Sequence, residues 1–162
     1  MKIFVTVALM YASVCNAGVC NDPKAMPGSA EGAHPIKALQ YCINPMVTAS
    51  AGYWASLGRM GDAECAQAPQ LAYTEANQCL EERIVGAVNS ANGKDDLRAA
   101  VKDFYIKQKA LVNAWLIGGQ SVAAYKAGLD DADSAMVSAW DKVKLEAKLA
   151  GVSLDVQKGG GK

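Results

Sequence analysis

The chain contains one histidine, which limits the acid–base chemistry open to it. Ser-His-Asp and Cys-His arrangements need an imidazole held rigidly beside the nucleophile. His34 instead ends a stretch of Gly, Pro and small polar residues over 18–34, directly before Pro35. Such composition is typical of loops. We therefore interpret His34 as a surface loop residue and predict no enzymatic activity.

Two groups of carboxylates invite a catalytic or metal-binding interpretation. Glu81 and Glu82 are adjacent, so on a helix they point apart rather than across a cleft. Asp130, Asp131 and Asp133 lack the turn glycine and the distal glutamate of an EF-hand loop. Acids are favoured at the positive N-terminus of a helix, so we expect this cluster to open one. Neither group predicts a metal site, and no cofactor is expected.

The cysteines predict disulfides rather than a metal site. Cys15 lies near the N-terminus, and the other four, Cys20, Cys42, Cys65 and Cys79, are separated by 21, 22 and 13 residues. Structural zinc needs clustered ligands such as paired Cys-x-x-Cys motifs. Four cysteines in an exported chain instead favour two disulfides. Three pairings are open, and spacing does not choose among them.

The N-terminus has the pattern of a secretory signal peptide. Lys2 precedes an apolar run over 3–10, and small side chains stand three positions and one position before a cut after Ala17. We therefore predict a secreted protein, extracellular or periplasmic. The expected segments are a signal peptide over 1–17, an extended arm over 18–34, a helical bundle domain over 35–151 and a flexible tail over 152–162.

Apolar spacing and boundary residues predict helices throughout the domain. The expected helices span 35–43, 45–60, Pro69 to Asn92–Gly93, Asp95 to Gly128, and Asp130 to Gly151. Gly118–Gly119 interrupts the fourth of these, which predicts a kink, a break or a close helix crossing. No run has the length and alternation of a strand. The predicted fold class is all-α, a bundle of four to five mostly antiparallel helices whose N-terminal half is stapled by two disulfides.

Two stretches carry no charged residue, 38–58 and 110–125. The first has about the length needed to span a bilayer, but its Gln, Asn, Pro, Thr and Ser residues oppose insertion. Burial in a bundle explains both stretches, and two such segments facing one another would also line an apolar cavity. The candidate ligand-binding residues are Tyr53, Trp54, Trp115, Tyr125 and Trp140. Aromatics at helical spacing also form ordinary cores, and that alternative stays open.

Composition and charge exclude several functional classes. With 16 basic and 16 acidic side chains and a pI near 6.6, the chain has no electrostatic footprint for nucleic acid. We predict a secreted, non-catalytic helical binding or interaction protein whose partner is an apolar small molecule or a protein. The alternatives are a membrane-active effector, which is not favoured, and an extracellular structural or assembly component.

Overall fold

A computed structural model describes residues 32–46, 63–115 and 122–155 of the chain. Its elements are the α-helices α2 (Pro35–Gln40), α4 (Ala63–Ser90), α5 (Asp95–Ala114) and α6 (Val122–Leu149), and the 3₁₀ helix η2 (Tyr41–Ile43). No strand occurs in these three ranges. The mainly helical fold class predicted from the sequence is therefore confirmed.

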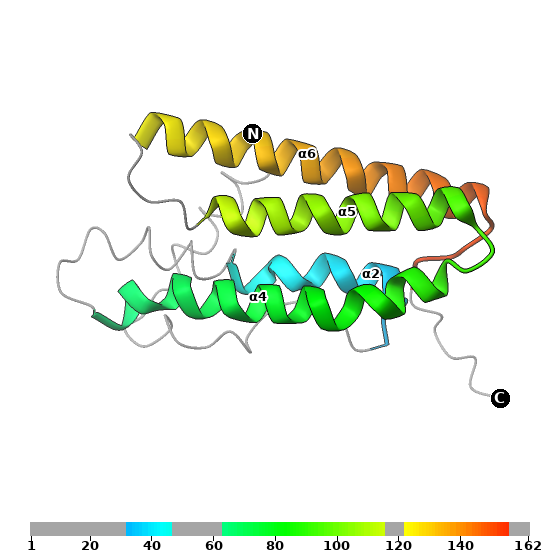
Figure 1. Cartoon of the computed structure of the whole chain (residues 1–162), viewed down its shortest axis with the longest axis horizontal. Coiled ribbons are helices and arrows are strands. Elements are labelled where there is room, and N and C mark those ends of the chain that lie inside the picture. The colour runs from blue at the N-terminus through cyan, green and yellow to red at the C-terminus, as the bar shows by residue number, and fades with distance from the viewer. Residues whose placement is uncertain (1–31, 47–62, 116–121, 156–162) are drawn as a thin grey trace.

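The three long helices run antiparallel to one another in chain order (Figure 1). α4 turns back into α5 through residues 91–94, and α6 then runs back along α5, so that α5 lies between α4 and α6. Short connections make consecutive helices neighbours in a bundle. α2 packs mainly on α4, and residues 44–46 continue its helical course after η2.

Several helix ends follow from recognisable local signals. α5 begins at Asp95 and carries acids in its first turn, where the positive end of the helix dipole favours them. Gly93, with φ 74°, supplies the left-handed residue in the turn before it. α6 ends in a Schellman motif, in which the Val152 N–H donates to the Ala147 carbonyl at 2.8 Å and Gly151 has φ 67°.

The predicted start of α4 is wrong. The helix begins at Ala63, so Pro69 lies inside it instead of opening it. The residues before the proline are Ala-Glu-Cys-Ala-Gln-Ala, which have high helix propensity on average and extend the helix in the N-terminal direction. The helix expected over 45–60 falls almost entirely outside the described residues.

The predicted boundary between the last two helices is also wrong. α6 begins at Val122, so Gly128 does not end a helix and Asp130 does not open one. A glycine in a helix interior costs only about 1 kcal/mol relative to alanine, and the alanine-rich sequence around Gly128 tolerates it. α5 ends at Ala114, and Gly118–Gly119, where a kink, break or close crossing was predicted, lies outside the described residues.

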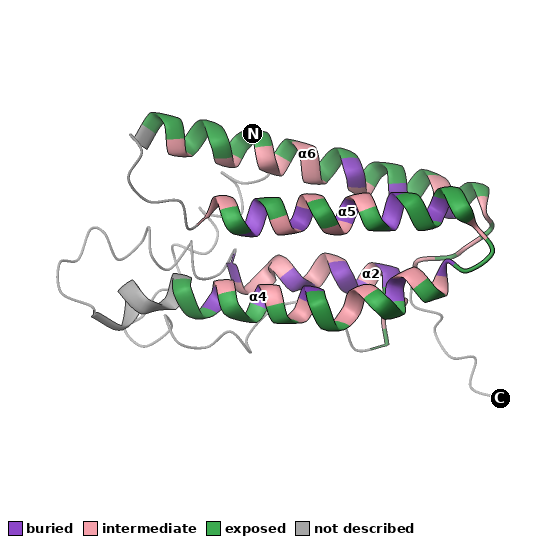
Figure 2. Cartoon of the chain, viewed as in Figure 1, coloured by how far each residue is buried: buried purple, intermediate pink, exposed green. Residues whose placement is uncertain are grey.

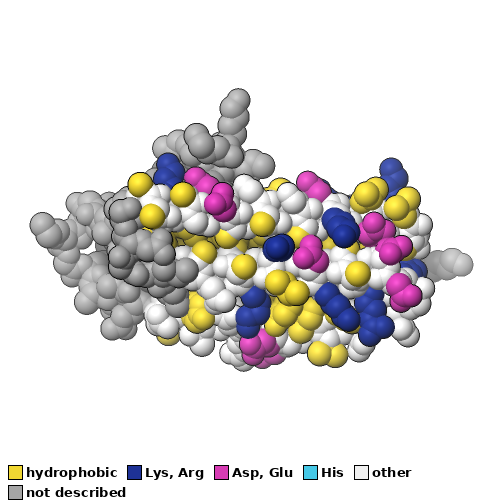
Figure 3. All heavy atoms as spheres, turned by 45° about the horizontal axis from the view of Figure 1, so that its top comes forward, with side chains coloured by type: hydrophobic (Ala, Val, Ile, Leu, Met, Phe, Trp, Pro, Cys, Tyr) yellow, Lys and Arg dark blue, Asp and Glu magenta, His cyan; other side chains and the backbone are white. Residues whose placement is uncertain are grey.

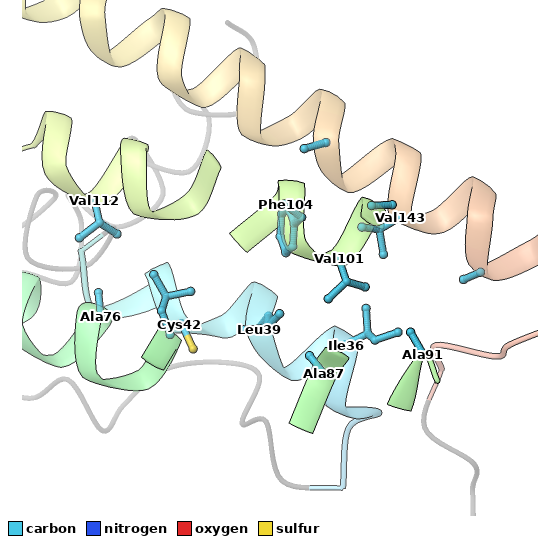
Figure 4. Packing of buried hydrophobic residues seen from close by; sticks show 14 of the residues in the cluster. Ile36, Leu39, Cys42, Ala76, Ala87, Ala91, Val101, Phe104, Val112 and Val143 are labelled. Atoms are coloured by element: carbon cyan, nitrogen blue, oxygen red, sulfur yellow. The ribbon is translucent and has the colours of Figure 1, made fainter. Parts of the chain in front are cut away.

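Side chains from all four α-helices meet in one apolar cluster (Figure 4). Ile36 and Leu39 of α2 point into the space between α4 and the other two long helices, toward Val101 and Val143. Figure 2 shows that the buried residues lie on the inward faces of the helices. The largest fully buried apolar side chains are Ile36, Leu39, Met46, Leu80, Leu97, Val101, Phe104, Val112 and Val143.

A disulfide between Cys42 and Cys79 joins η2 to α4, with an S–S distance of 2.03 Å and a Cα–Cα distance of 5.4 Å. This Cα–Cα distance is in the ordinary range for disulfides. It is the one disulfide seen within the described residues, where two were predicted for the chain. Cys20 and the side chain of Cys65 lie outside the described residues.

The first residues of the predicted tail pack back on the helices. Val152 and Leu154 are partly buried against the core, and the Lys37 Nζ lies 3.0 Å from the Asp155 Oδ1. Residues 152–155 therefore return from the end of α6 to α2. Because Asp155 is largely exposed, this ion pair contributes little to stability, and the apolar contacts matter more.

Candidate functional site

The structure describes three of the five aromatics predicted to bind a ligand, and it places them in two contacts between α5 and α6. Trp140 packs on Phe104, with the ring centroids 4.9 Å apart and the ring planes at 41°. The Tyr125 hydroxyl donates a hydrogen bond to the Trp115 carbonyl oxygen at 3.0 Å. Trp115 and Trp140 are both partly buried against the core.

These two contacts are well separated along the bundle. Tyr125 and Trp140 are 15 residues apart on α6, which is about 22 Å at 1.5 Å per residue. One small apolar molecule would therefore touch one contact and not the other. Tyr53 and Trp54, the remaining predicted wall residues, lie outside the described residues.

Gln108 is a fully buried polar residue in the apolar stripe of α5. Its Nε2 donates to the Leu39 carbonyl at 3.0 Å, near the end of α2, where the Tyr41 backbone N–H also donates to the Ala38 and Leu39 carbonyls. The Arg83 Nη1 lies 3.5 Å from the Ala38 carbonyl at the same end, where a cation also favours the helix dipole. The Gln108 Oε1 has no hydrogen-bond partner among the described residues, which leaves one buried acceptor free.

The structure gives His34 a capping role at the start of α2. Its Nδ1 accepts a hydrogen bond from the Ile36 backbone N–H at 3.3 Å, which satisfies a donor that the helix N-terminus leaves free. Only an unprotonated Nδ1 can accept this bond. Partial burial, and then the positive charge of Lys94, lower the pKa of His34 below the usual 6.5.

The acidic cluster of α6 forms no metal site within the described residues. Asp130, Asp131 and Asp133 lie in the third turn of α6, so their predicted role at a helix N-terminus is wrong. No group of three His, Cys, Asp or Glu side chains in the described ranges could hold a metal ion. Burial raises the pKa of Asp133, whereas a neighbouring cation would lower it.

The described ranges contain no helix that is both long enough and apolar enough to cross a bilayer. Parts of the two uncharged stretches lie in these ranges. Leu39, Cys42 and Met46 of the first, and Leu111 and Val112 of the second, are buried in the bundle.

The outer face of α5 consists of Arg98, Ala99, Lys102, Ile106 and Ala110, all of which are exposed. Ile106 is 58% exposed. Arg98 and Lys102 precede it by two turns and one turn of the helix, and neither forms an ion pair with a described residue. α5 has four basic and three acidic residues, and two of the acids lie in its first turn. Figure 3 shows basic, acidic and hydrophobic side chains side by side across the middle of the molecule.

The outer face of α4 has the opposite charge. It consists of Leu71, Glu75, Gln78, Glu82 and Val85, which recur at steps of four and three residues and are all exposed. Leu71 and Val85 are each 63% exposed. Over its length α4 has four acidic residues and one basic residue. The two outer faces therefore carry opposite charge in a chain whose net charge is zero.

Two polar contacts hold the line along which α4 and α5 pack. The Lys109 Nζ lies 2.9 Å from the Glu81 Oε1, and this hydrogen bond raises the pKa of Lys109. The Tyr73 hydroxyl donates to the Asn113 Oδ1 at 3.1 Å. Glu81 is thus engaged within the chain, whereas Glu75 and Glu82 form no ion pair with a described residue.

No protein-family model, curated protein or solved structure matches the chain. The functional argument therefore rests on the residues themselves. The net charge of the whole chain did not reveal the charged outer faces of α4 and α5, because the acidic face of one helix and the basic face of the other cancel in the sum. Counting charges helix by helix is the signal that could have found them.

Proposed function

We propose that the protein is a secreted, non-catalytic helical binding protein that engages its partner through the outer face of α5. The observation that carries this proposal is the exposed Ile106 on the same face as Arg98 and Lys102, which have no acidic partner among the described residues. Ala99 and Ala110 lie on the same exposed face, so Ile106 belongs to an apolar strip bordered by cations, and such strips favour an interaction site more than a single exposed side chain does. Unpaired cations favour an acidic partner and speed its encounter. The expected partner surface is therefore acidic, with an apolar ridge.

Export to an oxidising compartment is part of the proposal. The signal-peptide pattern over 1–17 supports it, and so does the Cys42–Cys79 disulfide. With those two cysteines paired, Cys20 and Cys65 are left for the second bridge, and we propose that they form it. We also propose that a further helix within 45–60 completes the predicted bundle.

An apolar ligand is the second candidate partner, favoured by the free Oε1 of Gln108 in an apolar interior. This acceptor suits a molecule with one hydroxyl or N–H group on an apolar body. Bound mass in a native spectrum that is lost on denaturation, and that is absent from Gln108→Leu, would support this candidate. A native spectrum without bound mass would favour binding through the outer face of α5 instead.

The surface proposal can be tested by titrating isotope-labelled protein with an acidic helical peptide built from Leu and Glu at heptad spacing. We expect amide shift changes concentrated at residues 98–110, and none with a control peptide in which Lys replaces Glu. A Lys102→Glu variant should lose the response, whereas Lys142→Glu, an exposed charge reversal on α6, should keep it. Changes spread over all helices, or equal changes with the Lys peptide, would refute the proposal.

A further inference from the structure

We infer that the partner of the α5 outer face is the α4 outer face of a second copy of this chain. The inference rests on the proposed function, because it assumes that the α5 outer face is a binding surface. It adds the identity of the partner. The two faces are those already defined, Leu71, Glu75, Gln78, Glu82 and Val85 on α4, and Arg98, Ala99, Lys102, Ile106 and Ala110 on α5.

Charge complementarity identifies the occupant. The outer face of α4 carries the acids Glu75 and Glu82, whereas that of α5 carries the bases Arg98 and Lys102. Within one copy, Glu81 and Lys109 make the one ion pair seen between the two helices in the described ranges. Glu75, Arg98 and Lys102 stay exposed and unpaired there, and Glu82 accepts only a neutral hydrogen bond from Gln78. The unpaired acidic side chains of α4 are thus complementary in charge to the unpaired basic side chains of α5.

An antiparallel register brings charges of the two faces together. If α4 of one copy lies antiparallel on α5 of the next, Glu82 can lie opposite Lys102. Glu75 and Arg98 then extend the acidic and the basic face by two turns and one turn of their helices. In this register Val85 falls opposite Ala99, which gives the exposed valine an apolar neighbour.

The contact is heterologous, because it joins two different surfaces of the chain. Each copy offers an acidic face to one neighbour and a basic face to another, so the copies form a chain or close into a ring. One helix laid along another buries less than the roughly 800 Å² per partner of a standard stable interface. The association is therefore weak, and it depends on protein concentration and on salt.

Charge exchange tests this inference. The first variant, Glu75→Lys with Glu82→Lys, makes both outer faces basic, and the second, Arg98→Glu with Lys102→Glu, makes both acidic. Sedimentation equilibrium at low salt should show mass rising with concentration for the wild-type protein, but not for either variant alone. An equimolar mixture of the two variants should assemble again, because each then offers the face that the other lacks.

Salt and a matched control complete the design. Assembly of the wild-type protein should fall at about 0.5 M salt, where screening is strong. Lys126→Glu with Lys142→Glu, two exposed charge reversals on α6, should assemble like the wild type. Far-UV circular dichroism confirms that each variant is folded before it is compared.

Two results would overturn the inference: a wild-type protein that stays monomeric at every concentration, or folded variants whose mixture does not assemble. If the wild type is monomeric but the acidic peptide still binds at residues 98–110, the proposed function stands and only the identity of the partner is wrong. If neither binding nor assembly occurs, both proposals fail.

Discussion

Removal of the Cys42–Cys79 disulfide gives the most quantitative prediction for this fold. The bridge spans a sequence separation of 37 residues and ties the segment of α2 and η2 to α4. For a loop of this length, the chain-entropy relation gives about 13 cal/mol/K of unfolded-state entropy, or about 4 kcal/mol at 25 °C. We therefore expect Cys42→Ala with Cys79→Ala to lower the free energy of unfolding by about 4 kcal/mol.

A smaller packing loss adds to this value. Cys42 is 1% exposed and lies in the core, so its replacement by alanine removes a buried sulfur at a cost of about 1 kcal/mol. A domain of this size has a total stability of about 5–15 kcal/mol. The variant should therefore be folded but close to its stability limit at 37 °C.

Urea unfolding followed by circular dichroism and tryptophan fluorescence measures the effect. A Cys20→Ala with Cys65→Ala protein, measured before and after reduction, is the matched control, because reduction then removes only the Cys42–Cys79 bridge and leaves the core side chains in place. The dependence of the unfolding free energy on urea should become steeper in both samples, since an uncrosslinked unfolded chain exposes more surface. A loss below about 1 kcal/mol, with no change of slope, would refute the loop-entropy reasoning.

Three further predictions concern single residues. The pKa of His34 is lower in the folded than in the unfolded state, so its neutral cap stabilises the fold fully above about pH 6.5. The free energy of unfolding should therefore fall as the pH drops through the folded-state pKa. His34→Asn still caps the helix and should remove this pH dependence in a series of urea titrations. Gln108→Ala should cost about 2–3 kcal/mol, because it leaves a cavity and removes the side-chain donor to the Leu39 carbonyl. Gln108→Met should cost less, and equal losses of unfolding free energy would count against a packing contribution. Gly151→Ala should destabilise the protein by about 1 kcal/mol, because the φ of Gly151 is positive. Gly86→Ala inside α4, where a new Cβ meets nothing within 4 Å, should stabilise it by about as much. Thermal unfolding in which both substitutions shift the melting temperature in the same direction would contradict this prediction.

Local signals predicted much of the fold, and the misses have a physical explanation. Pro35, Asp95, Gly93 and Gly151 each satisfy a backbone requirement at a helix end, so their types alone indicated the boundaries. The start of α4 was missed because helix-forming residues before Pro69 extend the helix beyond it. Similarly, one glycine within alanine-rich sequence is too weak a breaker to end α6.

The candidate site was harder to predict because it depends on which side chains are left exposed after packing. Ile106 lies two residues from Phe104 and from Gln108, so it is off the apolar stripe of α5, but only the packed structure shows that no other described element covers it. Gln108 sits in the apolar stripe, and only the position of the α2 carbonyls explains its burial. Trp140 was a candidate ligand contact by type alone, and its packing on Phe104 depends on how α6 lies against α5.

The central claim is that the protein is exported, stapled by two disulfides and binds through a helix surface rather than through an apolar pocket. The intact mass of the exported protein, recorded under denaturing and native conditions, tests this claim most directly. We predict the mass of residues 18–162 less four hydrogens, for two disulfides. Under native conditions we predict no bound apolar molecule, as expected for a protein that binds through a helix surface. A full-length chain with free thiols, or a native adduct that denaturation removes, would contradict the account.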